Sequence, residues 1–136
     1  MGLDNGIVLR GELPTTYDDV PHTLELHTDH MEICYWRKHW GLRDKILEVL
    51  CRNYERDNRE EVDYEWKLNH HDILDIIDLV QQELHKSTFE EWEEDSGCIW
   101  TWAESLPNNA RNLAHLYWLV EWMQDHACEV IFYDSY

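Results

Sequence analysis

The chain of 136 residues carries 29 acidic and 11 basic residues, which gives a formal net charge of −18. A field of this sign repels nucleic acid and anionic membrane surfaces and attracts cationic partners, so we expect no direct binding to nucleic acid or membrane. The length predicts a single domain that covers residues 1–136 and buries one core.

Two kinds of apolar pattern predict strands in the first quarter of the chain. Gly6–Arg10 is a short β-branched run bounded by glycine, which predicts a first strand and a turn. Between Pro21 and Trp36, apolar and polar residues alternate, which predicts two strands joined at residues 28–30.

The apolar period then becomes helical. One apolar stripe predicts a helix from about Trp40 to Tyr54, followed by a charged segment. Asn69 is a suitable N-cap for a second helix that ends near Leu84, with Asp72 in its first turn.

The last third of the chain contains further helix signals and a final strand. A capping-box pattern predicts a short helix over residues 88–97, and Pro107 marks the start of a long helix over about 108–127. Glu129–Tyr133 predicts a terminal strand. The fold class is therefore α+β, with a small antiparallel sheet of N-terminal strands plus the C-terminal strand packed against three or four helices.

Basic residues are concentrated in one stretch, because four of the 11 lie within Arg37–Lys45, next to tyrosine and tryptophan. Aromatic rings stack on nucleobases, and guanidinium groups pair with phosphate oxygens. The alternative is that the rings enter the core while the basic groups pair with nearby carboxylates. The predicted ligand-binding residues are Tyr35, Trp36, Arg37, Lys38, Trp40 and Arg43.

Acidic residues dominate the second half, where Lys86 and Arg111 are the only lysine and arginine after Lys67. Such a surface suits a mimic of nucleic acid or an inhibitor of a basic protein, although acidity also serves solubility. The predicted acidic interaction surface consists of Glu90, Glu91, Glu93, Glu94 and Asp95, together with Asp72, Asp75 and Asp78.

Enzyme signatures are missing from the sequence, which has no GxSxG, P-loop, dinucleotide fingerprint or HExxH pattern. We therefore predict no catalytic residues and no cofactor, and a non-catalytic role is favoured. His22, His27, Asp29 and His30 could meet around a metal, but their spacing matches no established site, so no metal is predicted.

The cysteine pattern bears on the cellular compartment. The four cysteines show no CxxC pairing, which favours free thiols in a reducing cytoplasm. No apolar run is long enough to span a membrane, so we expect a cytoplasmic protein. Its aromatic richness is also compatible with a homodimer.

Three segments carry a family resemblance: Met1–Asp4, Tyr35–Lys38 and Phe132–Tyr136. Together they resemble a family of small, uncharacterised tailed-phage proteins that open with MGLD, carry a YWRK motif and close in an aromatic strand. The resemblance implies a phage origin, and hence the cytoplasm of the host cell. Small phage proteins without enzyme signatures often act in counter-defence, which is an association and not a chemical argument.

Two functions follow from these observations. In the first, the protein is a non-catalytic counter-defence factor that binds and sequesters a small nucleotide-derived immune signal at the basic, aromatic stretch. In the second, it is an acidic inhibitor that docks on a basic host defence or nucleic-acid-binding protein. Binding of the second kind is expected to weaken steeply with added salt.

Overall fold

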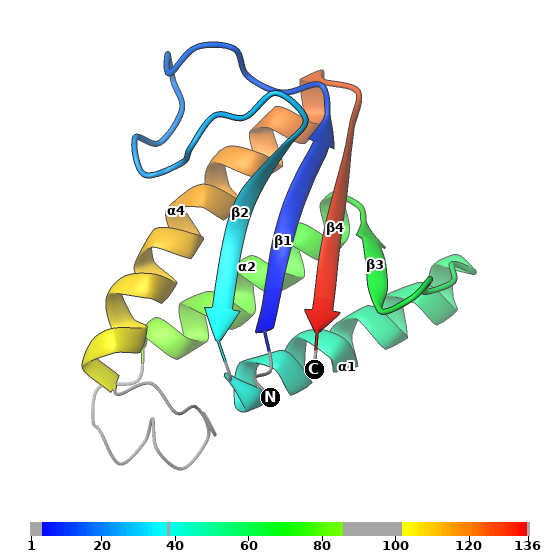
Figure 1. Cartoon of the computed structure of the whole chain (residues 1–136). Coiled ribbons are helices and arrows are strands. Elements are labelled where there is room, and N and C mark those ends of the chain that lie inside the picture. Colours follow the sequence, from blue (N-terminus) through cyan, green and yellow to red (C-terminus); the bar gives the residue numbers. More distant parts are fainter. Residues whose placement is uncertain (1–3, 38, 86–101, 136) are drawn as a thin grey trace.

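The computed structural model describes residues 4–37, 39–85 and 102–135, and it confirms the α+β fold class (Figure 1). One antiparallel sheet has the strand order β2-β1-β4-β3. Its strands are β1 (Asp4–Gly11), β2 (His30–Arg37), β3 (Glu65–Leu68) and β4 (Cys128–Ser135). The described helices are α1 (Trp40–Asp57), α2 (His70–Leu84) and α4 (Trp102–Asp125).

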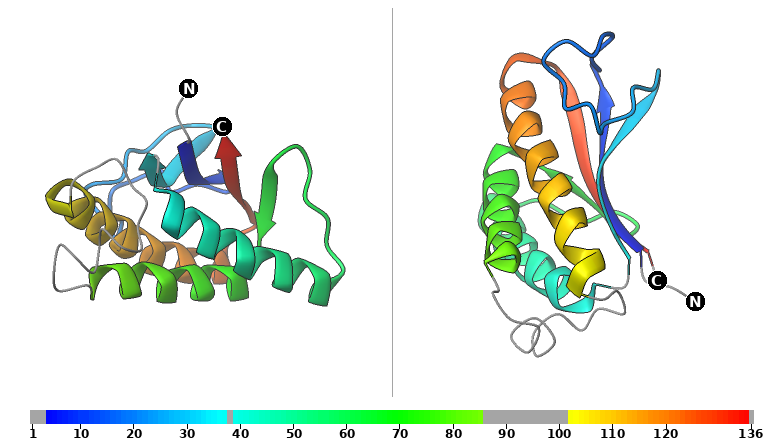
Figure 2. Two further views of the ribbon diagram at one scale, coloured as in Figure 1. Left: turned by 90° about the horizontal axis from the view of Figure 1, so that it is seen from below. Right: turned by 90° about the vertical axis from the view of Figure 1, so that its left-hand side faces the viewer.

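The helices cover one face of the sheet, so the described part of the molecule has two layers (Figure 2). Side chains alternate between the faces of each strand, and the inward ones form the core with the apolar stripes of the helices. In β1 and β4 the inward residues pair as Ile7 with Phe132 and Leu9 with Val130. The fully buried helix residues that meet them include Ile73, Ile76, Val80, Leu116 and Leu119.

The strand predicted before residue 28 is wrong, because residues 12–29 form a loop between β1 and β2. Leu24 is buried and Leu26 packs against the core, so the alternation reflects burial from a loop. A strand in this segment would have to pair with the free edge of β2. The carbonyl groups of Ile33 and Tyr35 in β2 instead accept hydrogen bonds from α4 side chains.

The second helix begins as predicted. The Asn69 side chain accepts a hydrogen bond from the backbone N–H of Asp72 (3.0 Å), and the Asp72 carboxylate accepts one from the backbone N–H of Asn69 (2.9 Å). The structure differs from the sequence prediction at the start of α4, which begins at Trp102 and contains Pro107. The strand β3 was not predicted. The short helix predicted over residues 88–97 lies outside the described residues.

The outer face of the sheet has a close contact at Gly6. The ring of Tyr133 in β4 lies across β1 at this position, and a Cβ atom added to Gly6 would lie 2.5–2.6 Å from the ring and hydroxyl atoms. Real Cβ contacts are essentially never this short. Gly6 therefore lets Tyr133 lie flat against the sheet, and any larger residue would displace the ring.

We expect Gly6→Ala to lower the free energy of unfolding by about 1–3 kcal/mol, since the added methyl group overpacks this contact. Urea unfolding of the purified variant measures the loss. The penalty should persist in a Tyr133→Phe background, where the ring remains, and should largely disappear in a Tyr133→Ala background. An equal penalty in all three backgrounds would contradict the contact as its cause.

Candidate functional site

Strand alternation separates the predicted ligand residues on β2. Tyr35 points to the outer face, where its hydroxyl group donates a hydrogen bond to the Asp4 carboxylate (3.0 Å). Trp36 points inward and is buried, and its indole N–H donates to the side-chain oxygen of Asn109 in α4 (2.8 Å). The two rings therefore cannot stack on one base, and Trp36 has a structural role in the core.

Arg43 is held by an ion pair within the chain. Its guanidinium group donates to both carboxylate oxygens of Asp134, at 3.2 and 2.7 Å, and the two side chains are only 12% and 5% exposed. Asp134 also accepts a hydrogen bond from the amide group of Asn5 (2.5 Å). The ion pair and the hydrogen bond to Asp134 connect α1 with β4 and β1, so Arg43 stabilises the fold.

The structure describes only some of the remaining predicted residues. Arg37 ends β2 and is exposed, whereas Trp40 begins α1. Lys38 lies outside the described residues, as do Glu90, Glu91, Glu93, Glu94 and Asp95. Asp72 does not belong to an acidic surface, because it is fully buried and paired with Arg59 at 2.7 Å.

We expect Arg43→Ala to lower the free energy of unfolding by about 3 kcal/mol, because truncation leaves the buried carboxylate of Asp134 without its cation. Chemical denaturation gives the value. Arg52→Ala, at an exposed position of α1, is the matched control and should change stability by no more than about 0.5 kcal/mol. A loss below about 1 kcal/mol in Arg43→Ala would contradict a structural ion pair.

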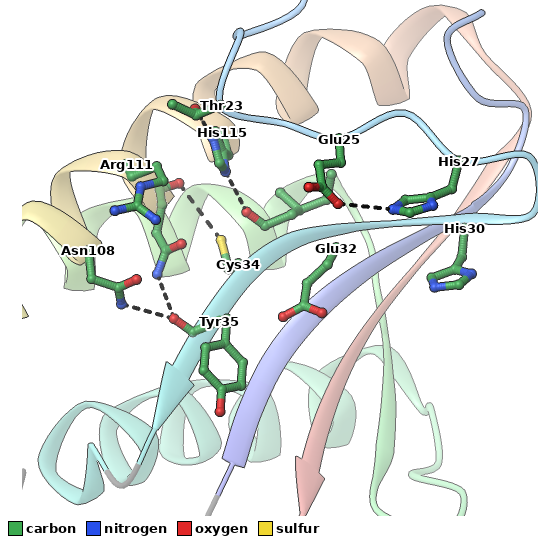
Figure 3. Close-up of a pocket in the computed structure, with 12 residues that line it drawn as sticks. Thr23, Glu25, His27, His30, Glu32, Cys34, Tyr35, Asn108, Arg111 and His115 are labelled. Carbon is green, nitrogen blue, oxygen red and sulfur yellow. Dashed lines mark hydrogen bonds and ion pairs between the residues drawn. The ribbon is translucent and has the colours of Figure 1, made fainter.

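A polar pocket lies between β2, the 12–29 loop and α4 (Figure 3). We call it the β2–α4 pocket; it encloses about 340 Å³. Of the predicted site residues that the structure describes, only Tyr35 lines it. The lining residues are Thr23, Glu25, His27, His30, Glu32, Ile33, Cys34, Tyr35, Asn108, Arg111, Asn112 and His115.

Polar side chains of α4 build the inner wall of this pocket. The amide groups of Asn108 and Asn112 donate to the carbonyl oxygen of Tyr35, at 2.9 and 3.1 Å. The Nδ1 atom of His115 lies 2.8 Å from the carbonyl oxygen of Ile33. These bonds satisfy the outer edge of β2, and they hold α4 at the distance that leaves the pocket open beside the strand.

Charged groups and imidazoles gather toward the loop side. Glu25 contacts His27 (3.5 Å), and the rings of His27 and His30 stack with their centroids 5.6 Å apart. Burial raises the pKa of Glu32 above its ordinary value of 4.5, an effect that nearby His30 opposes. Arg111 is the only lysine or arginine among the described residues that line the pocket. The pocket therefore presents both hydrogen-bond donors and acceptors to a ligand.

Cys34 and His115 are two groups of the β2–α4 pocket that could act as a nucleophile or a general base. Burial raises the pKa of the Cys34 thiol well above its ordinary value of 9.0, so it stays protonated at neutral pH. The ring of His115 is engaged through both nitrogens, since Nε2 lies 2.5 Å from the hydroxyl oxygen of Thr23. These two groups are suited to holding the wall of the pocket.

Among the described residues, no three metal-ligating side chains come together, and His30 contacts the carboxylate of Asp29 (3.0 Å). None of the described helices combines the length and apolar character needed to cross a membrane. No family model, curated protein or solved structure matches the chain.

Sequence reasoning missed the α4 side of the pocket. Asn108, Asn112 and His115 are spaced four and three residues apart, so they share one helix face, and Arg111 lies beside them. A row of polar residues on a helix that also carries an apolar, core-facing stripe indicates that this polar face covers a polar group elsewhere in the chain. The sequence alone does not show that the covered group is the edge of β2.

Lowering the pH should destabilise the protein through His115. Burial lowers the pKa of His115 below its ordinary value of 6.5, so the unfolded chain binds the proton more readily. The stability that the neutral ring provides is present above pH 6.5 and is lost as the pH falls from there toward the folded pKa. Urea unfolding at about pH 7.5 and 5.5 should show a smaller loss in His115→Gln than in the unmodified protein, and equal losses would contradict this assignment.

Proposed function

We propose that the protein binds a small nucleotide-derived ligand in the β2–α4 pocket and sequesters it without turnover. The observation that carries the proposal is a pocket of about 340 Å³ whose polar lining includes one guanidinium group, two carboxylates and three imidazoles. This volume lies within the range of small-molecule sites, about 300–1,000 Å³. The predicted ligand class is kept, whereas the proposed site moves from the basic stretch to the pocket.

The groups of the pocket suit the parts of a nucleotide. Arg111 is exposed and offers a planar donor pair to one phosphate group. Glu25 and Glu32 accept hydrogen bonds, as ribose hydroxyls and an exocyclic amine require. The stacked pair of His27 and His30 presents aromatic surface beside them.

The same carboxylates restrict the charge of the ligand. A single phosphate is paired by Arg111, but a polyphosphate would bring further negative charge near Glu25 and Glu32. Repulsion between these carboxylates and the additional phosphate groups disfavours binding. We therefore favour a nucleotide with one phosphate group, or a cyclic nucleotide, over a triphosphate.

Sequestration is favoured over catalysis because the pocket holds no activated nucleophile among its described groups: the Cys34 thiol is protonated and His115 is engaged. The three described cysteines are free, a state that a reducing compartment favours. On the resemblance to phage proteins, we extend the proposal to a counter-defence role in the cytoplasm of the host cell.

Calorimetric titration with adenosine monophosphate, 3′,5′-cyclic adenosine monophosphate and adenosine triphosphate tests the proposal. We expect micromolar affinity for at least one of the first two and about tenfold weaker binding of the triphosphate. Arg111→Ala should weaken binding about tenfold or more, since a hydrogen bond to a charged group contributes about 1.5–3 kcal/mol. The ligand should be recovered chemically unchanged.

Arg52→Ala removes an exposed arginine from α1 and is the matched control, so its affinity should equal that of the unmodified protein. Absence of binding to all three nucleotides, or equal affinity in Arg111→Ala, would overturn the proposal. Hydrolysis of the bound nucleotide would replace sequestration by catalysis.

A further inference from the structure

The described groups of the β2–α4 pocket offer the base of a nucleotide mainly hydrogen-bond acceptors. The amide groups of Asn108 and Asn112 already donate to a carbonyl group of β2, at 2.9 and 3.1 Å. Both ring nitrogens of His115 are engaged as well. Glu25 and Glu32 also line the pocket, and an ionised carboxylate accepts hydrogen bonds but donates none. These groups therefore favour a base that presents donors.

Glu32 is the carboxylate better suited to recognising a base. It lies in β2, whereas Glu25 lies in the loop before this strand and has a side chain that is 86% exposed. Burial is the largest effect on the pKa of Glu32 and raises it, because the carboxylate is partly withdrawn from water. Hydrogen bonds are electrostatically stronger where water is partly excluded. Figure 3 shows Glu32 between Arg111 on the α4 side and the rings of His27 and His30.

The carboxylate of Glu32 keeps acceptor positions for a ligand. The charged neighbours that act on its pKa are His30 and Asp4, and neither is an arginine that would pair with both carboxylate oxygens. Hydrogen bonding by Tyr133 uses one acceptor position. An ionised carboxylate has about four such positions, so Glu32 can accept two more hydrogen bonds from a base.

The other contacts of the ligand do not distinguish one base from another. Arg111 pairs with a phosphate group, which every nucleotide carries. The rings of His27 and His30 offer stacking, and every base has a face that stacks. Hydrogen bonds to the edge of a base are what specify it, so the choice of base depends on Glu32.

We propose that the β2–α4 pocket selects guanine nucleotides, with the Glu32 carboxylate accepting hydrogen bonds from N1–H and the 2-amino group of the base. This inference rests on the proposed function, since it assigns the base of the same ligand. The two donors of guanine lie side by side, as do the donors with which a guanidinium group binds a carboxylate. Adenine presents one donor next to the lone pair of N1, so it makes one hydrogen bond with Glu32 and places that lone pair against the second oxygen.

Calorimetric titration of the full chain at neutral pH with guanosine, inosine and adenosine monophosphates tests the assignment. We expect guanosine monophosphate to bind at least tenfold tighter than adenosine monophosphate. Inosine monophosphate keeps N1–H but lacks the 2-amino group, so its affinity should lie between the other two. This series uses the unmodified protein and therefore does not depend on the folding of any variant.

Glu32→Gln should reverse the preference. Its side-chain amide group offers one acceptor and one donor, which match the exocyclic amine and N1 of adenine. Guanosine monophosphate should bind at least tenfold more weakly to this variant, whereas adenosine monophosphate should bind as before or more tightly. Glu121→Gln, at an exposed position of α4 outside the pocket, is the matched control and should leave both affinities unchanged.

Equal affinity of the unmodified protein for guanosine and adenosine monophosphates would overturn the guanine assignment. If both then still depended on Arg111, the proposed function would stand without it. Weakening of both nucleotides by the same factor in Glu32→Gln would also overturn the assignment, since it would show a contact that does not distinguish the bases. Absence of binding to all nucleotides tested would overturn the proposed function and this inference together.

Discussion

The contact of α4 with the free edge of β2 is the constraint on which the rest of the structure depends. Asn108, Asn112 and His115 donate to two carbonyl groups of the strand, and Asn109 accepts the indole N–H of Trp36 from the same strand. These bonds close an edge that would otherwise recruit another strand. They also fix the distance between helix and sheet, which creates the β2–α4 pocket and leaves residues 12–29 without a strand to pair with.

A second constraint is the buried carboxylate of Asp134, which engages the guanidinium group of Arg43, a residue of the basic stretch, within the fold. An isolated ionised carboxylate in the interior is strongly disfavoured, so the fold must bring a cation and donors to it. Arg43 and Asn5 fill this role from α1 and β1. The alternation of side chains along β2 separates two further residues of the basic stretch, since Trp36 points inward while Tyr35 remains on the outer face.

The features that the sequence predicted correctly depend on neighbours along the chain. The capping box of Asn69 and Asp72 and the apolar stripe of α2 are local patterns, and the sheet of terminal strands follows from short apolar runs. The features that the sequence did not show involve partners far apart along the chain. Arg43 and Asp134 are separated by 91 residues, so the sequence does not indicate that these two side chains pair. Leu24 is a second example, because a buried leucine gives the same apolar and polar alternation in the sequence whether it lies in a loop or in a strand.

Tyr133 extends from β4 across β1 on the outer face of the sheet, where its ring lies against Gly6. Partial burial raises the pKa of Glu32 in β2, and hydrogen bonding by Tyr133 opposes this effect. Glu32 also lines the β2–α4 pocket. An ionised carboxylate only accepts hydrogen bonds, whereas a protonated one also donates, so the ionisation of Glu32 bears on the outer face of the sheet as well as on this pocket.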